Sequence, residues 1–433
     1  MAKAPKGTSE RRSNVRHGKQ RRSSAIRNIS KGVLSGALVL GISAVSIGAY
    51  AAWDLTTRLK PTVSLGTDAP DGAQISAKEG ELNIFLAGTD SRAGQSIDDG
   101  EEGELTDVML LLHVSADHKN ATVISFPRDL MVPIPNCPVE DTTDEYYPAM
   151  SEQQLNSAIS YGGLPCTVRT VEELTGMDIP NAGLISFDGV IAMSNAIGGV
   201  DVCLTQPIVD PNTDLDLPAG DVTLKGVEAL QFLRTRHGVG NGGDTSRISN
   251  QQVFMSAMVR KIKDSDTLTN PMKLFQLAKA TAENVTLSDS LNSVPVLQSV
   301  AMAVKDIDLD RINFVQYPSA THPYQSGRLT PDYASAELML EVVKAGERFE
   351  LGSTGVAVEL KDGETVEATA PETTTPEGEV TPPVEGETPA ETPATGTEGT
   401  DPATPKPGPT QLSDNVTGQS AAAVTCSAGR TQY

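Results

Sequence analysis

The sequence predicts an α/β domain in which helices cover both faces of a central mixed β-sheet. A single membrane-spanning helix precedes this domain and a disordered tail follows it. Short apolar runs alternate with amphipathic stretches over residues 81–350, a pattern typical of an α/β sheet covered on both faces. A charge-free stretch lies before this region, and after it the composition shifts to Thr, Pro, Glu and Gly.

The N-terminal segment predicts a membrane anchor. Residues 1–31 carry a net charge of +9, although the whole chain has a charge of −22. Residues 32–53 contain no charge, and this length is close to the ~20 residues that cross a bilayer as a helix. The positive-inside rule then places residues 1–31 in the cytoplasm and everything after Trp53 outside the cell membrane. A cleaved signal peptide is the alternative, since Ala49-Tyr50-Ala51 fits a small-x-small cleavage site.

The first part of the folded region predicts a spacer and three strands. Residues 54–80 are polar and contain scattered prolines and glycines, as expected of a juxtamembrane spacer. Apolar runs at 82–87, 108–114 and 121–126 indicate buried strands. Residues 117–120 have the composition of a hairpin turn between the second and third strands.

The remainder of the folded region predicts mostly helices with a few strands between them. Apolar positions spaced by a helical turn, with glycines or prolines at the boundaries, indicate the helices. We expect helices at 151–161, 167–175, 190–197, several between 224 and 304, and 334–344, with strands at 183–187, 200–204 and 312–317.

Four cysteines fit an extracytoplasmic location. No pair has Cys-x-x-Cys spacing and no histidine cluster accompanies them, which argues against zinc. Disulfides are the natural interpretation outside a reducing cytosol. Cys137 and Cys166 bracket one loop-rich insertion and are the preferred pair, while the pairing of Cys203 and Cys426 stays open.

The C-terminal part, 351–433, predicts a disordered tail. Its Thr/Pro/Glu-rich composition leaves too few apolar residues to offset the entropy of ordering the chain. The final stretch, 421–433, is too short to form a domain. We therefore place the boundaries of the folded domain at residues 81 and 350.

One stretch, 233–252, concentrates charged and glycine residues. Two arginines lie at the end of one predicted helix, and a turn with four glycines follows. A second predicted helix then begins with an aspartate that can cap it and continues with an arginine and a glutamine. Such a set suggests a site for a multiply charged anion, because the planar guanidinium binds phosphate oxygens bidentately. Helix-capping arginines with an ordinary loop are the alternative. The residues are Arg234, Arg236, Asp244, Arg247 and Gln251.

Further charged residues lie at the ends of the predicted strands. Asp90 and Arg92 follow the first strand and Arg128 follows the third, and ligands of open α/β sheets bind beyond the carboxyl ends of strands. Asp107 begins the second strand, so it can join Asp90 if these two strands are antiparallel. Two carboxylates beside several arginines suit a pyrophosphate with magnesium, which takes few protein carboxylates and completes its shell with phosphate and water.

Together these motifs resemble the LytR-CpsA-Psr family of cell-wall glycopolymer ligases. The matching runs lie in the expected order between about residues 82 and 260, and the cysteine pattern and the tail are similar to actinobacterial members. The runs are 83–92, 107–113, 125–129, 156–163, 171–176, 196–202, 220–237 and 244–252.

The resemblance implies a membrane-anchored phosphotransferase. Such an enzyme moves a glycopolymer from a polyprenyl-pyrophosphate carrier onto peptidoglycan, or onto a surface protein, through a phosphodiester bond. Magnesium is the implied cofactor, with manganese as the alternative. The implied location is the cell membrane, with the catalytic domain outside, and nucleic acid is not an expected partner.

The resemblance also implies roles for individual residues. It assigns the metal to two aspartates, the pyrophosphate to a set of arginines with neighbouring residues of the same motifs, and catalysis to four of these side chains. The metal residues are Asp90 and Asp107; the pyrophosphate residues are Arg92, Arg128, Arg234, Arg236, Asp244, Arg247 and Gln251; the catalytic residues are Asp90, Asp107, Arg128 and Arg247.

One departure from the family pattern leaves two alternatives open. The family commonly has arginine two positions before the second aspartate, and here that residue is Leu105. A protein that binds the lipid-linked glycan without turning it over is therefore one alternative. A membrane-bound transcriptional attenuator is the other, but residues 1–31 show neither aromatic residues nor a helix-turn-helix pattern.

Overall fold

The computed structural model forms two units, residues 1–54 and 55–433. Most of the predicted membrane span lies outside the residues that the structure describes, and among the described residues no helix is both long and apolar enough to cross a membrane. The described residues are 60–66, 80–89, 105–139, 145–264, 270–291, 293–361 and 409–430, with scattered positions between 30 and 58.

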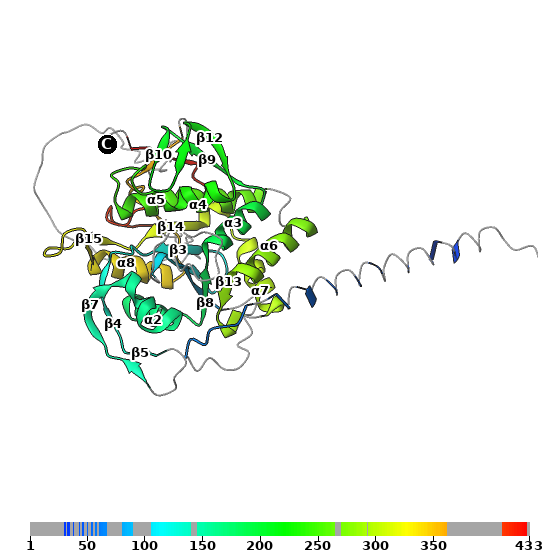
Figure 1. Ribbon diagram of the computed structural model, residues 1–433, viewed down its shortest axis with the longest axis horizontal. Coiled ribbons are helices and arrows are strands. Elements are labelled where there is room, and N and C mark those ends of the chain that lie inside the picture. Colours follow the sequence, from blue (N-terminus) through cyan, green and yellow to red (C-terminus); the bar gives the residue numbers. More distant parts are fainter. Residues whose placement is uncertain are drawn as a thin grey trace, which may run out of the picture. The chain divides into compact units, whose positions relative to one another are not determined.

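A seven-stranded sheet forms the centre of the larger unit (Figure 1). Its two longest strands are central in the strand order, with shorter strands on either side. In order across the sheet the strands are β13 (Val285–Leu287), β8 (Asn181–Ile185), β1 (Leu82–Thr89), β2 (Thr106–Val114), β3 (Ala121–Ser125), β14 (Ile312–Gln316) and β20 (Gly418–Ser420).

The sheet is mixed, as the sequence predicts. Strand β1 is antiparallel to β2 and parallel to β8, and β3 is antiparallel to β2 and parallel to β14. Thr89 at the end of β1 pairs with Thr106 at the start of β2. The antiparallel arrangement that brings Asp107 to the end of β1 is therefore confirmed.

Helices cover both faces of the sheet. Successive residues of a strand point to opposite faces. In β1, Phe85 and Ala87 belong to an apolar cluster with side chains of α2 and α8, and Ile84 and Leu86 belong to another with side chains of α5 and α7. These helices span Ala158–Thr175 (α2), Asp244–Asp264 (α5), Val294–Lys305 (α7) and Tyr333–Lys344 (α8).

A second sheet of four strands lies apart from the central one, and the remaining strands form two-stranded pairs. The second sheet has the order β12 (Gly220–Leu224), β9 (Val200–Leu204), β21 (Thr425–Ser427) and β18 (Val358–Leu360). The pairs are β4 (Met131–Ile134) with β7 (Met150–Gln154), β5 (Cys137–Pro138) with β6 (Tyr146–Tyr147), β10 (Ile208–Asp210) with β11 (Leu215–Leu217), β15 (Ser319–Thr321) with β16 (Leu329–Pro331), and β17 (Phe349–Glu350) with β19 (Thr410–Gln411). The other helices are α3 (Phe187–Ala196), α4 (Val227–Arg234), α6 (Pro271–Asn284) and the short 3₁₀ turns η1 (Leu155–Ser157), η2 (Asp289–Leu291) and η3 (Leu309–Arg311).

The helix predicted at 151–161 is only partly correct. Its first half is strand β7, which pairs with β4 and is followed by η1, so α2 begins at Ala158. Gly162 and Gly163 have non-helical backbone angles and kink α2 just before Pro165. A Cβ atom at Gly162 would lie 2.5 Å from the carbonyl oxygen of Pro138, so only glycine fits where the helix meets β5.

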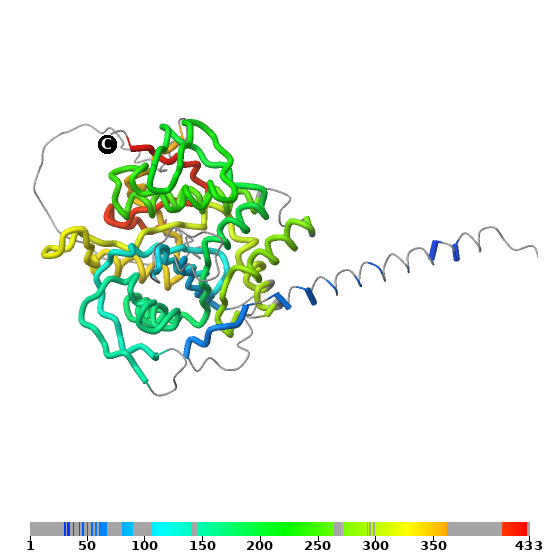
Figure 2. The backbone as a smooth tube through the Cα atoms, in the orientation of Figure 1, coloured from blue at the N-terminus to red at the C-terminus, as the bar shows by residue number. Residues whose placement is uncertain are grey.

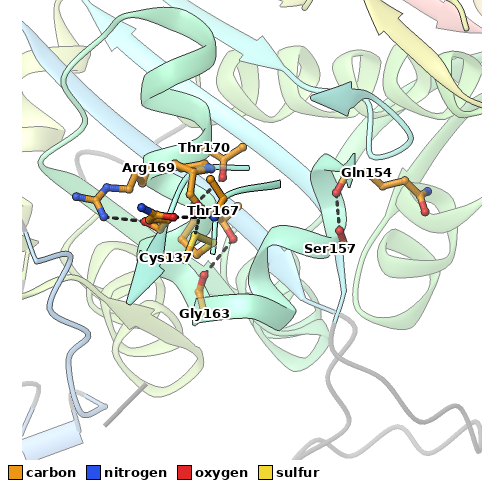
Figure 3. Close-up of a disulfide and its surroundings, with 11 residues drawn as sticks. Cys137, Gln154, Ser157, Gly163, Thr167, Arg169 and Thr170 are labelled. Atoms are coloured by element: carbon orange, nitrogen blue, oxygen red, sulfur yellow. Dashed lines mark hydrogen bonds between the residues drawn. A yellow bond between two sulfur atoms is a disulfide. The ribbon is translucent and has the colours of Figure 1, made fainter. Parts of the chain in front are cut away.

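Both disulfides are closed. Cys137 and Cys166, the pair preferred from the sequence, join β5 to α2 (Figure 3). In the same region Arg169 donates a hydrogen bond to the carbonyl oxygen of Asn136 at 3.0 Å. The second disulfide joins Cys203 of β9 to Cys426 of β21. It closes a loop that contains much of the folded domain.

The C-terminal prediction needs correction. Residues 351–361 and 409–430, which the sequence analysis assigned to the disordered tail, are ordered and contain the short strands β18 to β21, whereas 362–408 lie outside the described residues. Strand β20 pairs with β14 and completes the central sheet, and β21 pairs with β9 and β18. The C-terminal segment, red in Figure 2, thus runs among the green elements of the domain. Strands β20 and β21 each have only three residues. They form because strands distant in the sequence supply their hydrogen bonds. A local sequence pattern does not predict such pairing.

His113 is a buried strand residue whose protonation is coupled to folding. It is 2% exposed, and its Nδ1 lies 2.7 Å from Oδ1 of Asn83. Burial lowers the pKa of His113 to about 4. Between pH ~6.5 and 4 the unfolded chain therefore binds a proton that the folded protein does not. We expect the free energy of unfolding to fall as the pH drops through this window, by about 3 kcal/mol.

Urea unfolding at pH 7.0 and pH 4.5 measures this effect. The variant His113→Gln has no titrating group at this position, so its stability is expected to fall less between the two pH values than that of the wild type. Equal losses in both proteins would contradict the prediction.

Candidate functional site

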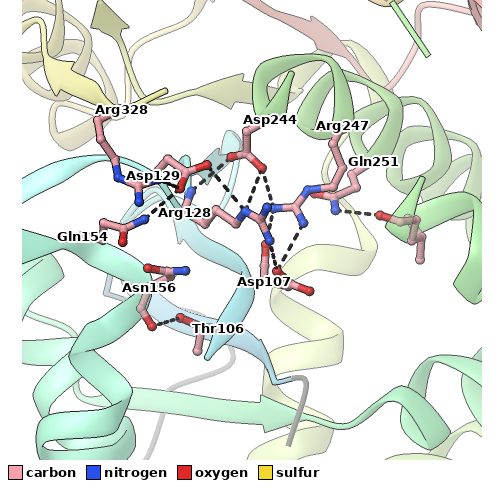
Figure 4. Close-up of polar contacts among 11 residues, drawn as sticks. Thr106, Asp107, Arg128, Asp129, Gln154, Asn156, Asp244, Arg247, Gln251 and Arg328 are labelled. Carbon is pink, nitrogen blue, oxygen red and sulfur yellow. Dashed lines mark hydrogen bonds and ion pairs between the residues drawn. The ribbon is translucent and has the colours of Figure 1, made fainter. Parts of the chain in front are cut away.

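Four of the predicted residues come together at one end of the central sheet (Figure 4). Asp107 lies at the start of β2 and Arg128 just after the end of β3, and the antiparallel β2–β3 pairing brings these two ends together. Asp244 and Arg247 lie in the first turn of α5. We call these four residues the charged cluster.

Asp107 lies between two guanidinium groups. Arg128 donates from one terminal nitrogen to Oδ1 of Asp107 at 2.6 Å, and Arg247 donates to the same oxygen at 3.3 Å. Arg247 also donates to the backbone carbonyl of Asp107 at 2.8 Å. Charge-assisted hydrogen bonds of this kind hold the planar guanidinium groups of both arginines in fixed positions.

Asp244 connects α5 to the segment after β3. Its Oδ1 lies 2.6 Å from a terminal nitrogen of Arg247, and its Oδ2 accepts a hydrogen bond from the backbone nitrogen of Arg128 at 3.2 Å. The side chains of Asp244 and Arg247 are 6% and 4% exposed. Asp244, expected to cap α5, is instead the first residue of the helix, and its carboxylate contacts both arginines.

The electrostatics keep Asp107 ionised. Burial alone would raise the pKa of Asp107, but Arg247 and Arg128 more than offset it, so the pKa lies below its usual range. A carboxylate with a lowered pKa is a weak base. Asp107 is therefore suited to orient a group or hold a cation rather than to remove a proton.

The other predicted residues lie at the end of α4, in the turn after it and on α5. The guanidinium of Arg234, in the last turn of α4, lies 4.5 Å above the centre of the Phe187 ring. Arg236 is half-buried in the turn that follows. Gln251 donates to the carbonyl oxygen of Leu233 at 2.9 Å, so this amide fastens α5 to the end of α4.

Two predicted site residues lie outside the described part of the chain. Asp90 and Arg92 follow β1 directly, but the described residues end at Thr89 and resume at Leu105. Leu105 precedes β2 and is 38% exposed. The assignments of Asp90 and Arg92 therefore remain predictions.

Asp210 is a functional residue that the sequence analysis missed. It is fully buried at the end of β10, and its Oδ2 accepts hydrogen bonds from the Thr235 hydroxyl at 2.7 Å and from the backbone nitrogens of Arg236 and His237 at 3.2 and 3.1 Å. Burial would raise the pKa of Asp210, but hydrogen bonds from Thr235, Asn212 and Arg236 lower it below its usual range. Asp210 thus fixes the turn that carries Arg236. The sequence signals only its local Asp-Pro turn, not its distant partners.

Replacing Asp210 with alanine tests this role. The change leaves five donors without their acceptor, among them the buried Thr235 hydroxyl, so we expect a loss of about 2–4 kcal/mol in the free energy of unfolding. Denaturant unfolding measures the loss. Asp216→Ala, at an exposed position in the neighbouring strand β11, is the control and is expected to change stability by less than about 0.5 kcal/mol. Equal stabilities of the two variants would contradict this role for Asp210.

A second group of missed residues adjoins the cluster. Asp129 accepts hydrogen bonds from Gln154 and from Arg328, both at 2.8 Å. Its Oδ2 also lies 3.6 Å from Nε of Arg128. Gln154 and Arg328 come from β7 and from the loop before β16, so sequence order gave no sign that they approach Arg128.

Comparison with known proteins gives consistent matches. The sequence profile of the LytR_cpsA_psr family matches residues 56–341. The cell wall biosynthesis protein LcpA of Corynebacterium glutamicum is 28% identical over 291 residues, which are 61% of this chain and 54% of that protein. The probable cell wall biosynthesis protein LcpB of the same organism is 29% identical over 282 residues, 63% of this chain and 62% of that protein.

A third relative carries an enzyme name. The polyisoprenyl-teichoic acid–peptidoglycan teichoic acid transferase TagU of Enterococcus faecalis is 24% identical over 283 residues, 64% of this chain and 86% of that protein. The chain spans less than two thirds of the length of the two corynebacterial relatives.

Proposed function

Because this chain belongs to the LytR_cpsA_psr family, we propose that it is a phosphotransferase that moves a glycopolymer from a polyprenyl-pyrophosphate carrier onto peptidoglycan through a phosphodiester bond. The charged cluster carries the proposal. The buried Arg247 and the half-buried Arg128, each held by carboxylates, lie at the end of the sheet where α/β proteins bind ligands. The name of the Enterococcus relative describes the same class of reaction.

The arginines are the groups that bind the pyrophosphate. Arg128 and Arg247 are already neutralised by Asp107 and Asp244, so they contribute fixed hydrogen-bond donors more than surplus charge. The other arginines assigned to the pyrophosphate are Arg234 at the end of α4, Arg236 in the turn after it, and Arg92, which follows β1 in the sequence. Guanidinium groups held in place cost little reorganisation when charge develops on a phosphoryl oxygen.

Asp107 fits one ligand position of a magnesium ion, with manganese as the alternative. Both arginine contacts are to its Oδ1, and no contact within the described part of the chain engages Oδ2. Among the described residues no three His, Cys, Asp or Glu side chains gather into a metal site of their own. That agrees with a cation held by Asp107, by Asp90 and by the substrate's phosphates. When bound, the ion neutralises charge on the phosphoryl oxygens.

The proposed step is an in-line displacement. The acceptor hydroxyl oxygen bonds to the phosphorus next to the glycan, the bond from this phosphorus to the bridging oxygen breaks, and polyprenyl phosphate leaves. The hydroxyl proton passes to solvent or to the departing phosphate. Arg128 and Arg247 hold the oxygens of the pyrophosphate during this exchange. Asp107, with its lowered pKa, orients the reacting groups.

We place the enzyme at the cell membrane. The support is the sequence pattern: the charge-free stretch 32–53 follows the basic stretch 1–31, which the positive-inside rule keeps in the cytoplasm. The closed disulfides agree with an oxidising compartment for the folded domain. The lipid carrier and the enzyme are then held in the same bilayer.

The test is a transfer assay with the full chain in detergent. A synthetic polyprenyl-pyrophosphate glycan and peptidoglycan oligomers are incubated with and without magnesium, and polyprenyl monophosphate is measured. We expect magnesium-dependent release, abolished in Asp107→Ala and retained in Lys261→Ala, which removes an exposed ion pair with Asp201. Release without magnesium, or full activity of Asp107→Ala, would contradict the proposal.

Leu105 favours a second candidate function. It stands beside β2 where the family commonly has arginine, so one phosphate contact is replaced by an apolar side chain. A protein that holds the lipid-linked glycan without transferring it would bind the donor tightly and release no monophosphate. In that case Leu105→Arg is expected to produce turnover.

A further inference from the structure

A line of alternating charges continues from the charged cluster to the β15–β16 hairpin. Arg128 contacts Asp129, and Asp129 accepts from Arg328 at 2.8 Å (Figure 4). Arg247 stands at one end of this line, on α5, and Arg328 stands at the other. The proposed pyrophosphate site uses Arg247 and Arg128 but neither Asp129 nor Arg328.

The hairpin is joined directly to the segment that carries Arg128. The backbone nitrogen of Leu329 donates to the carbonyl oxygen of Asp129 at 3.0 Å, and Leu130 and Leu329 form a parallel β-bridge. The base of the hairpin therefore lies beside the charged cluster.

The loop of this hairpin has a fixed shape. His322 is 8% exposed, and its Nδ1 accepts hydrogen bonds from the backbone nitrogens of Tyr324 and Gln325 at 3.3 and 3.0 Å. Its Nε2 lies 3.2 Å from Oε1 of Glu152 on β7, and Gln325 donates to the other oxygen of Glu152. Tyr324 projects from this braced backbone and is 91% exposed. The hairpin thus presents an aromatic ring that is anchored yet open to solvent.

Asn156 offers a free acceptor on the same side. It is 6% exposed, and within the described part of the chain its Oδ1 has no hydrogen-bond partner. Figure 4 shows its carboxamide turned toward Arg128 and Gln154 and away from Thr106. An unpaired buried carbonyl lowers the stability of the folded protein by about 1–3 kcal/mol. A ligand hydroxyl that donates a hydrogen bond to this oxygen offsets the loss.

We propose that Asn156, Gln154, Arg328 and Tyr324 form a subsite for the saccharide acceptor. This proposal rests on the proposed function and identifies where its second substrate binds. An exposed aromatic ring packs against the apolar face of a sugar, while amide and guanidinium groups bind its hydroxyls and carboxylates. The pairing of an open ring with fixed polar groups is the chemistry of saccharide binding.

The geometry favours the acceptor over the donor. In-line displacement requires the acceptor to enter opposite the departing lipid phosphate. Arg234 ends α4 and Arg236 follows it, and Gln251 fastens the end of α4 to α5, so we place these two arginines, which are assigned to the donor, at the α5 end of the line. The hairpin lies at the other end. In this arrangement the attacking hydroxyl of the acceptor donates a hydrogen bond to Oδ1 of Asn156. This bond directs the hydroxyl oxygen toward the phosphorus.

The first experiment measures saccharide binding without donor. The probe is a soluble tetrasaccharide of the peptidoglycan glycan strand, titrated into the full chain and followed by NMR or calorimetry. We expect Tyr324→Ala and Arg328→Ala each to weaken binding about tenfold, or 1.4 kcal/mol. The matched controls are Tyr146→Ala, also an exposed tyrosine (57%), and Arg348→Ala, which removes an exposed pair with Asp310.

The second experiment measures steady-state transfer. Tyr324→Ala and Arg328→Ala are expected to raise the KM for the acceptor about tenfold and leave the KM for the donor within twofold. Asn156→Ala is expected to lower kcat, and Asn156→Ser, which restores an acceptor oxygen, to recover part of it. A rise in the donor KM instead would assign these residues to the donor glycan and overturn the proposal.

The outcomes separate the two proposals. Wild-type protein that binds the tetrasaccharide through Tyr324 and Arg328 but releases no monophosphate would support the subsite and contradict the proposed transfer. If the wild-type protein is active but Tyr324→Ala and Arg328→Ala behave like their controls, the result would support the proposed transfer and contradict the subsite.

Discussion

Replacing Arg247 with alanine is expected to abolish transfer and to destabilise the folded domain. The change removes every contact of a guanidinium that is 4% exposed and takes one of two arginine partners from the carboxylates of Asp107 and Asp244, which then pair with Arg128 alone among the arginines of the charged cluster. Breaking a buried ion pair from one side costs about 3–5 kcal/mol. Loss of one donor that stabilises developing phosphoryl charge lowers kcat by a further ~10²–10³.

Arg247→Lys separates the two effects. Lysine keeps the charge between Asp107 and Asp244, but it lacks the planar fork that reaches both carboxylates and the backbone carbonyl of Asp107. We expect most of the stability to return while kcat stays about a hundredfold below that of the wild type. Denaturant unfolding and the transfer assay measure the two quantities on the same preparations.

The control is Lys261→Ala on the same helix. It removes an exposed pair with Asp201, and such pairs contribute about 0–1 kcal/mol. If Arg247→Ala were as stable and as active as this control, the charged cluster would be neither a structural nor a catalytic centre.

The sequence was sufficient to predict the elements whose pattern is local. The apolar runs that became β1, β2 and β3 show buried residues at their expected positions, and the antiparallel β1–β2 pair brought Asp107 where the prediction required it. The four residues of the charged cluster were also named beforehand. They come from motifs with chemical meaning of their own: arginines and aspartates next to strand ends and glycine turns.

The residues that the sequence did not reveal work through distant partners. Asp210 reads as a turn residue, yet its carboxylate holds the backbone of Arg236. The sequence gives no sign that Arg328 and Gln154 are more than surface residues, yet both donate hydrogen bonds to Asp129. In each case the informative contact joins segments more than 20 residues apart, so neither periodicity nor composition carries it.

The C-terminal strands show the same limit in the backbone. A three-residue strand such as β21 has no periodicity to detect, and it follows a long Thr/Pro/Glu-rich stretch that lowers any local expectation. Its stability comes from pairing with β9 and β18 and from the disulfide to Cys203. Cys426 was the one sign in the sequence that this segment returns to the domain.

Removing residues 409–433 is expected to destabilise the domain and to loosen the glycine turn that precedes Asp244. The backbone nitrogen of Arg430 donates to the carbonyl of Gly238 at 2.9 Å, and the nitrogen of Gly240 donates to Ala428 at 3.2 Å. The truncation breaks these bonds and also exposes the edge of β14. Loss of a native disulfide alone costs about 2–5 kcal/mol, so we expect Tm to fall by about 10 °C.

Three measurements decide whether the C-terminal strands act through the glycine turn. Hydrogen exchange of residues 238–243 is expected to accelerate in the truncated protein and less in Cys426→Ser, which keeps the backbone bonds. Deleting residues 371–400 leaves both strands and the disulfide in place and is the matched control, expected to retain the wild-type Tm. If truncation lowered Tm but left exchange in the turn unchanged, the strands would stabilise the sheet without positioning Asp244 and Arg247. Because the turn leads directly into α5, faster exchange should coincide with weaker binding of the pyrophosphate donor, and that coincidence would tie the last residues of the chain to its active site.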